Sequence, residues 1–288
     1  MGDDGATGSS LFGDYSAESI EEMPEAQQRL LAHFDDLRSR MLDEVETLLQ
    51  TLDPEIGQRV YEIAFKPNDA VPKRDERPKI EIVHLAEQCY LAHGDDDADR
   101  RRVLQFALVA HEYYDLLDDV VDDDVAPGRE TEVVLVTQLL MPTLLRVLAD
   151  LGEDVQRYWS DRAIELVGAP LLEEDRDPSG DVYLDVLARQ SDLFGSMTGA
   201  AAMAGGADTD GVSRAREIGS TYYKCEQMLL DVAQFPDDED RWNARAFFTE
   251  NEIARLLDGW RAEVSPQIDE LPEPRARLVR PLFFRSSD

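Results

Sequence analysis

The stretch His111-Glu-Tyr-Tyr-Asp-Leu-Leu-Asp-Asp-Val-Val-Asp-Asp-Asp124 is the most informative segment of this chain. It follows the apolar run Val103-Leu-Gln-Phe-Ala-Leu-Val-Ala110, and the two segments together predict one helix. In that helix Asp118 and Asp122 lie on one face, and Asp119 lies beside them. Carboxylates this close repel one another, so the cluster requires a cation. Oxygen ligands of this kind are typical of Mg2+ that also holds a phosphate group.

Acidic runs are common in this chain, so solvated surface is the alternative interpretation of the cluster. Asp and Glu number 62 against 29 Lys and Arg, which gives a formal net charge of −33. Runs such as Asp95-Asp-Asp97 and Asp237-Asp-Glu-Asp240 indicate solvated surface. The cluster near Asp118 differs because it ends an apolar helix, where a merely solvated run has less reason to be. Its position therefore favours a metal site.

The net charge excludes several classes of partner. Nucleic acid and anionic membrane surfaces would both be repelled, so we expect neither as a partner. Lys occurs only at positions 66, 73, 79 and 224, yet 43% of the residues are hydrophobic. This combination is typical of a salt-in halophile, since molar salt shortens the Debye length to ~3 Å and makes self-repulsion tolerable. Long apolar periodic segments argue against an intrinsically disordered acidic chain.

The cysteines and the first residues bear on the cellular compartment. Cys89 and Cys225 are the only cysteines, and both lie in helical patterns without metal-ligand spacing. We interpret them as buried thiols, which are consistent with a reducing cytosol. The acidic, polar start predicts no signal peptide, and no apolar run approaches the length of a membrane span. We therefore expect a cytoplasmic protein.

The rest of the chain predicts one all-α domain over residues 23–288, after a disordered acidic tail over residues 1–22. No strand series, Gly-rich phosphate loop or Ser-His-Asp arrangement is recognisable. The segment over 133–151 is nearly all apolar and contains Pro142, so we expect a buried, kinked helix. Helical periodicity predicts helices at 26–52, 79–93, 100–124, 133–151, 153–167, 182–206, 211–234 and 250–270.

Two further segments each leave two interpretations open. Lys73, Arg74 and Arg77 gather between two prolines in a chain where basic charge is scarce. They form either an anion clamp or a set of pairs with surface acids. Residues 195–206 are almost all small, which either lets helices approach closely or leaves room for a ligand.

The motifs, in their order, resemble those of the trans-isoprenyl diphosphate synthases, also called polyprenyl synthetases, over roughly residues 27–240. The segment 109–122 is similar to the family's first aspartate-rich region, including the His seven positions ahead of the first Asp. Residues 183–194 resemble its Lys-Thr-containing helix. Residues 73–78 resemble its Gly-Lys-Arg-x-Arg-Pro loop with one extra residue.

The resemblance implies a bundle of helices around a central apolar cavity, usually paired as a dimer. It implies head-to-tail transfer of a prenyl group from an allylic diphosphate to isopentenyl diphosphate, with Mg2+ as cofactor. Metal and basic groups would stabilise the leaving diphosphate, while a dry cavity would protect the allylic cation. The expected partners are these two diphosphates and a second subunit, either the same chain or another prenyl synthase.

The resemblance also implies roles residue by residue. The metal ligands are Asp118, Asp119, Asp122 and Asp231. The residues that bind the diphosphates are Lys73, Arg74, Arg77, His111, Arg129 and Gln227. Arg189 stands where the family has a catalytic Lys, so the charge is kept and the shape differs. Tyr113 and Tyr114 resemble the bulky floor of short-chain synthases and imply a short product.

Departures from the family pattern concern its second aspartate-rich region. Of three aspartates only Asp231 is kept, with Leu230 and Gln234 in the other two places. The paired Arg after the first region is reduced to Arg129, which is displaced. Each missing carboxylate near a divalent ion costs several kcal/mol, at ~4 kcal/mol per pair of unit charges 4 Å apart and an effective dielectric of 20.

These features leave two hypotheses. The chain is a divergent short-chain prenyltransferase that works with one intact aspartate cluster. Alternatively it is a non-catalytic relative, which is either a partner subunit of an active synthase or a binder of prenyl diphosphates. A third hypothesis is a terpene-cyclase-like enzyme. The chain lacks the Asn/Ser/Glu-type second motif that such an enzyme needs.

Overall fold

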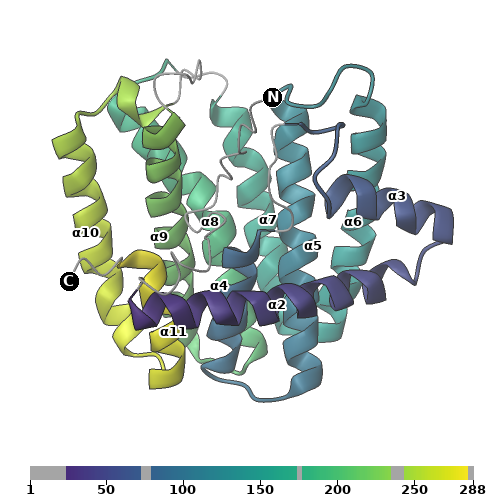
Figure 1. The fold of residues 1–288 in the computed structure, drawn as a ribbon, viewed down its shortest axis with the longest axis horizontal. Helices are drawn as coiled ribbons and strands as arrows, with labels where there is room; N and C mark the ends of the chain where they lie inside the picture. The colour runs from purple at the N-terminus through teal and green to yellow at the C-terminus, as the bar shows by residue number, and fades with distance from the viewer. Residues whose placement is uncertain (1–23, 73–78, 174–176, 235–242, 285–288) are drawn as a thin grey trace, which may run out of the picture. The chain divides into compact units, whose positions relative to one another are not determined.

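The computed structural model describes residues 24–72, 79–173, 177–234 and 243–284, and the regular structure in these ranges is entirely helical (Figure 1). The predicted all-α fold is therefore confirmed. The chain divides into two compact units: Met1–His84 with Asp96–Gly152, and Leu85–Asp95 with Glu153–Asp288. The predicted tail over 1–22 lies outside the described residues, and the prediction of a single domain over 23–288 stays a prediction.

The first unit is built around α5, the helix that the sequence pattern predicts. α5 packs against α6 and α2, while α3 packs against α2, α5 and α6. The Asp96 side chain starts α5 by accepting hydrogen bonds from the backbone N–H groups of Ala98 and Asp99. The helices of this unit are α2 (Glu25–Leu49), α3 (Pro54–Ala64), the first turn of α4 (Ile80–Leu91), α5 (Asp97–Val121) and α6 (Glu130–Leu151).

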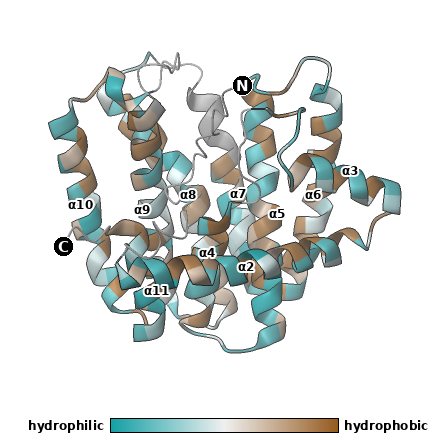
Figure 2. Ribbon diagram, viewed as in Figure 1, coloured by the Kyte–Doolittle hydropathy of each residue, from teal (hydrophilic) through white to brown (hydrophobic). Residues whose placement is uncertain are grey.

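A buried carboxylate joins α2 to α5. Glu44 on α2 is 4% exposed and accepts hydrogen bonds from Arg101 Nε and Gln105 Nε2, both at 2.6 Å. The next two turns of α5 are apolar and buried from Val103 to Ala110 apart from Gln105. Figure 2 shows apolar stretches along α5 in brown. Packing of this stretch fixes the direction in which the last turns of α5 point.

α6 corrects one prediction. The segment over 133–151 is helical and continuous through Pro142, but it is not fully buried, since Leu135 is 60% exposed and Val134 and Leu145 are also exposed. The physical reason is that α6 packs against α5 and α3 within its unit with only part of its apolar surface. By length and composition alone α6 is also apolar enough to cross a membrane, and 39% of its apolar stretch is buried. Core helices of soluble proteins meet the same criterion.

The second unit is dominated by the pairing of α8 with α9. α7 packs against α8, and α10 packs against α9. α7 continues to Glu173, beyond the predicted end at residue 167, and the apolar C-terminal segment forms a helix that periodicity does not predict. The elements are the rest of α4, α7 (Glu153–Glu173), α8 (Gly180–Ala204), α9 (Thr209–Gln234), the 3-10 turn η1 (Ala244–Ala246), α10 (Glu250–Asp269) and α11 (Glu273–Phe283).

The run of small residues in α8 serves close packing. A Cβ atom added at Gly195 would collide with Ser220 on α9, and one added at Gly199 would collide with Tyr158 on α7. Gly219 on α9 likewise faces the backbone of α8. Of the two interpretations of residues 195–206, close helix approach is the one that these contacts favour.

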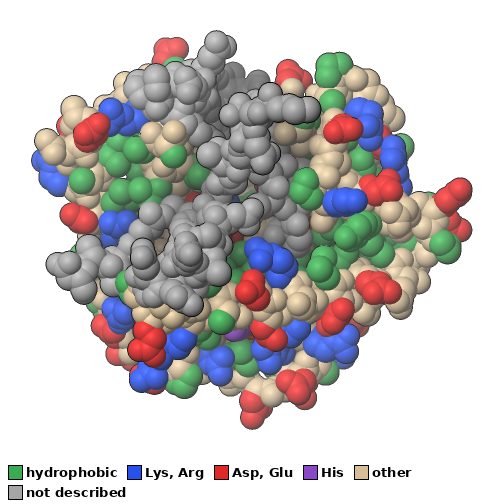
Figure 3. All heavy atoms as spheres, in the orientation of Figure 1, with side chains coloured by type: hydrophobic (Ala, Val, Ile, Leu, Met, Phe, Trp, Pro, Cys, Tyr) green, Lys and Arg blue, Asp and Glu red, His purple; other side chains and the backbone are tan. Residues whose placement is uncertain are grey.

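Acidic and basic side chains are interspersed over the described part of the face in Figure 3. Many of the ion pairs join residues three or four apart on one helix, as in Arg40–Asp36 and Arg157–Glu153. Exposed pairs of this type contribute about 0.3–0.5 kcal/mol each. Arginines are therefore engaged locally by the excess of acids.

Candidate functional site

The three predicted metal ligands lie at the C-terminal end of α5. Asp118 and Asp122 are exposed, Asp119 is half-buried, and Asp122 caps the helix by donating its N–H to the Asp118 carbonyl at 2.9 Å. The last turn of α5 carries no basic residue. Because the C-terminal end of a helix is itself negative, three carboxylates there strongly favour a cation. The donor set therefore fits Mg2+, although the ligand role stays a prediction.

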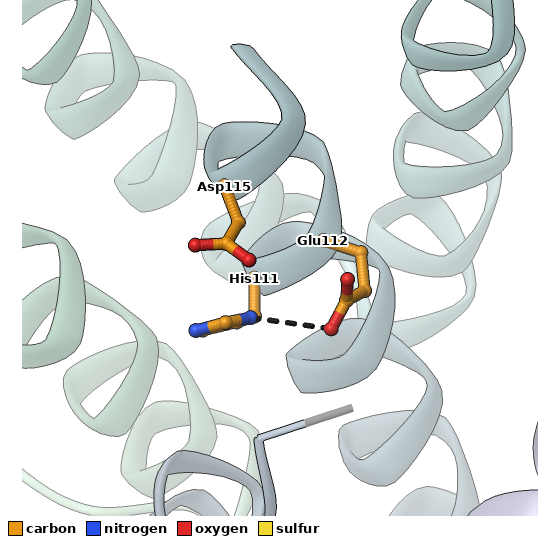
Figure 4. Close-up of side chains that lie close together, drawn as sticks. All are labelled: His111, Glu112 and Asp115. Carbon is orange, nitrogen blue, oxygen red and sulfur yellow. Dashed lines mark hydrogen bonds and ion pairs between the residues drawn. The ribbon is translucent and has the colours of Figure 1, made fainter. Parts of the chain in front are cut away.

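The preceding turns of α5 carry a second polar group (Figure 4). His111, Glu112 and Asp115 offer ligand atoms that all lie within 4.8 Å of one another. Glu112 is fully buried, and His111 Nδ1 lies 3.4 Å from Glu112 Oε1. Together His111, Asp115, Asp118 and Asp122 follow helical spacing, so α5 carries a polar stripe that ends in the acidic cluster.

Glu112 and Asp115 are members of this site that the sequence interpretation missed. Asp115 could have been found, because it lies four residues after His111 and three before Asp118. Glu112 could not have been predicted as a site residue, because on an ideal helix it points about 100° away from His111 and because glutamate is rarely buried.

Tyr113 and Tyr114, the predicted floor residues, contact each other edge to face with their ring centroids 5.0 Å apart. Tyr113 is buried and Tyr114 half-buried. Burial raises the pKa of both phenols, so they stay neutral at ordinary pH. Two bulky rings therefore lie one turn before the acidic cluster.

Arg129, predicted to bind a diphosphate, pairs with a carboxylate instead. Its Nε lies 2.6 Å from Glu132 Oε2, and Arg59 on α3 pairs with the other oxygen of Glu132. Partial burial opposes ionisation of Glu132, but hydrogen bonds and charge from Arg129 and Arg59 outweigh it and lower the pKa of this carboxyl. Arg129 would have to leave this pair to reach an anion.

The predicted basic loop with Lys73, Arg74 and Arg77 lies outside the described residues. The residues just before it are ordered by Asn68, whose side chain accepts a hydrogen bond from the Ala70 N–H at 2.8 Å. The Ala70 carbonyl in turn accepts from the N–H of Ala126 at 2.8 Å. The chain therefore enters the loop beside the turn that follows the acidic end of α5.

In the second unit Arg189 lies on the surface of α8. Its Nε lies 3.2 Å from Asp185 Oδ2, and both side chains are 44% exposed. Such a pair contributes little to stability and can open at low cost. Arg189 is therefore available to an anion, although it is not held in a preorganised position.

Asp231 and Gln227 on α9 are joined to each other and to α8. Gln227 Nε2 donates to Asp231 Oδ1 at 2.8 Å, and the Tyr183 hydroxyl donates to Asp231 Oδ2 at 2.8 Å. The Ala244 N–H also donates to Oδ2, at 2.7 Å. Asp231 is 4% exposed. Both predicted site residues are thus engaged in one buried hydrogen-bond network.

The described residues form an all-α architecture with an acidic end on α5, and comparison with solved structures shows which known fold this architecture has. No protein-family model and no curated protein matches the chain. Solved structures, in contrast, match the chain. A geranyltransferase from Legionella pneumophila matches with a TM-score of 0.69 at 14% identity, over 92% of this chain and 100% of its own.

Two other solved structures agree. A geranylgeranyl pyrophosphate synthetase from Geoglobus acetivorans matches with a TM-score of 0.68 at 14% identity, over 88% of this chain and 97% of its own. A polyprenyl synthase from Caulobacter crescentus, complexed with calcium and isoprenyl diphosphate, matches with a TM-score of 0.63 at 16% identity, over 90% and 98%. The chain has the fold of the trans-isoprenyl diphosphate synthases, as the motifs predict.

Proposed function

We propose that this protein is a Mg2+-dependent short-chain prenyltransferase that condenses an allylic diphosphate with isopentenyl diphosphate. The observation that carries the proposal is the end of α5, where Asp118, Asp119 and Asp122 follow one another within five residues and the last turn holds no basic residue. That arrangement is unfavourable for a helix end unless a cation is bound. The fold shared with prenyl synthases supplies the substrate class.

The three carboxylates would hold the metal. When bound, Mg2+ would neutralise the allylic diphosphate and stabilise its charge as it leaves. The bond between the allylic carbon and the diphosphate oxygen breaks, and the diphosphate leaves with the electron pair. The double bond of isopentenyl diphosphate then supplies the electrons of the new carbon–carbon bond, and a proton is lost.

Other residues of the chain would bind and shield the substrates. Lys73, Arg74 and Arg77 would hold isopentenyl diphosphate with His111, because the chain enters this loop beside the end of α5. The buried apolar turns of α5 would exclude water from the allylic cation. The rings of Tyr113 and Tyr114 would limit the growing chain to a short product.

A second candidate function is a non-catalytic partner subunit or prenyl diphosphate binder. It is favoured by Arg129 and Asp231, which are predicted to contact substrate or metal and are instead engaged within the protein. Leu230 and Gln234 add no carboxylate beside Asp231. In either case we propose a dimer that pairs through the exposed apolar residues of α6. A cytoplasmic location and a halophilic source stay predictions.

The deciding experiment is a product assay with a matched control. The protein is purified in molar KCl with Mg2+ and given isopentenyl diphosphate with dimethylallyl, geranyl or farnesyl diphosphate, and products are detected by mass. We expect a short chain-extended product that Asp118→Ala abolishes and Asp123→Asn retains. Asp123 is the matched control because it belongs to the same acidic run but adopts φ 57°, a conformation that asparagine tolerates.

Two other outcomes redirect the proposal. An unchanged rate in Asp118→Ala would mean that the metal site is assigned wrongly. No product from any pairing, with the protein folded, would favour the second candidate. Co-purification with an active synthase and a changed rate of that synthase would then support a partner subunit.

A further inference from the structure

Asp231 is the one carboxylate kept from the second aspartate-rich region, and its hydrogen bonds point to a role other than metal binding. We infer that Asp231 is a structural anchor that ties η1 and α8 to the end of α9, and that among the residues that the structure describes metal binding is confined to α5. The second half of this inference rests on the proposed function, whereas the first half stands on geometry alone.

The carboxylate of Asp231 accepts three hydrogen bonds from donors within the protein. Oδ2 accepts from the Tyr183 hydroxyl at 2.8 Å and from the Ala244 N–H at 2.7 Å, and Oδ1 accepts from Gln227 Nε2 at 2.8 Å. Three donors leave little of the acceptor capacity of two oxygens. A metal on Oδ2 would displace the Tyr183 hydroxyl or the Ala244 N–H, and that buried donor would then lack an acceptor.

Burial argues in the same direction. Asp231 is 4% exposed, whereas Mg2+ gives up its water reluctantly and usually keeps several water ligands. Glu226, the other acid of this part of α9, is 1% exposed and accepts a hydrogen bond from the Tyr222 hydroxyl at 3.2 Å.

The hydrogen bonds around Asp231 show which elements it holds together. Asn243, which is 3% exposed, donates from Nδ2 to the main-chain oxygen of Asp231 at 2.9 Å and accepts from the Arg245 N–H at 2.9 Å. Asn243 thus caps η1 and the last turn of α9 together. Ala244 and Tyr183 belong to one buried apolar cluster, so Asp231 is the polar centre that fixes the register of these three elements.

The test separates metal binding from stability in the full-length protein. Mn2+, which substitutes for Mg2+ and is visible by electron paramagnetic resonance, is titrated into wild type, Asp231→Asn and Asp118→Asn, and the Tm of each is measured. We expect Asp231→Asn to bind the same number of Mn2+ ions within twofold affinity while its Tm falls by several degrees. Asp118→Asn should lose Mn2+ affinity at least tenfold with its Tm unchanged.

A second variant keeps the inference testable if Asp231→Asn does not fold. Tyr183→Phe removes one donor and leaves the carboxylate, so an anchor predicts a lower Tm with unchanged Mn2+ binding. Loss of bound Mn2+ in Asp231→Asn, or a Tyr183→Phe variant with unchanged Tm, would overturn the anchor. If the wild-type protein binds no Mn2+, the proposed function and the inference that metal binds only on α5 are both wrong. The Tm values of the variants still decide whether Asp231 is a structural anchor.

Discussion

Glu44→Ala is expected to destabilise the protein because it removes the buried carboxylate that joins α2 to α5. A hydrogen bond from Gln105 to a charged, buried acceptor contributes about 1.5–3 kcal/mol. The pair with Arg101 adds only about 0–1 kcal/mol, since the Arg101 side chain is 59% exposed and solvent screens it. The total is about 1.5–4 kcal/mol. For a chain of this size that corresponds to a fall in Tm of roughly 3–16 °C.

The assay is thermal unfolding in molar KCl, followed by circular dichroism. Glu46→Ala is the matched control, because Glu46 is exposed on the same helix and its loss should change the free energy of unfolding by no more than about 0.5 kcal/mol. Glu44→Gln should fall between wild type and Glu44→Ala, as it keeps the shape and one acceptor. Equal Tm values for Glu44→Ala and Glu46→Ala would refute the idea that this carboxylate braces α5.

Two further predictions concern assembly and pH. Leu135→Asp should convert a dimer to a monomer, as measured by light scattering after gel filtration. Leu42→Asp, which changes an exposed leucine on α2, should leave the dimer intact. A wild-type protein that is already monomeric would contradict pairing through α6. Burial raises the pKa of Cys89 to about 12 and of Cys225 to about 11, so the unfolded thiols ionise first as pH rises above ~8.5 and the free energy of unfolding falls. Cys89→Ala should flatten that fall in urea midpoints between pH 8 and 11, and an unchanged slope would count against the burial of this thiol.

Local periodicity predicted the features that depend on one helix at a time. The face shared by Asp118 and Asp122 follows from helical spacing alone, and so does the apolar stretch that buries the middle of α5. The run of small residues such as Gly195 left close helix approach and room for a ligand both open, and the contacts between α8 and α9 favour close approach. These predictions hold because each depends on contacts within a few residues or on the size of a side chain.

The engagement of the site residues depended on contacts that spacing does not encode. The partners of Asp231 come from Tyr183 and Ala244, which lie 48 and 13 residues away in the chain, and no local pattern joins them. The pairs of Arg189 with Asp185 and of Arg129 with Glu132 are different, since they lie four and three residues apart. Residues three or four apart on a helix are neighbours, so both pairs could have been predicted by looking for an acidic residue at those distances from each arginine.

The same excess of acids bears on how an anionic substrate could bind. A diphosphate that recruits Arg129 must compete with Glu132, and one that recruits Arg189 must compete with Asp185, so each contact exchanges one carboxylate partner for another anion. The gain from such an exchange is small. A cation at the end of α5 meets no such competition from a basic residue in that turn, and it adds two positive charges beside the diphosphate. Under the proposed function, and among the described residues, recognition of a diphosphate would therefore depend more on metal held by Asp118, Asp119 and Asp122 than on arginine.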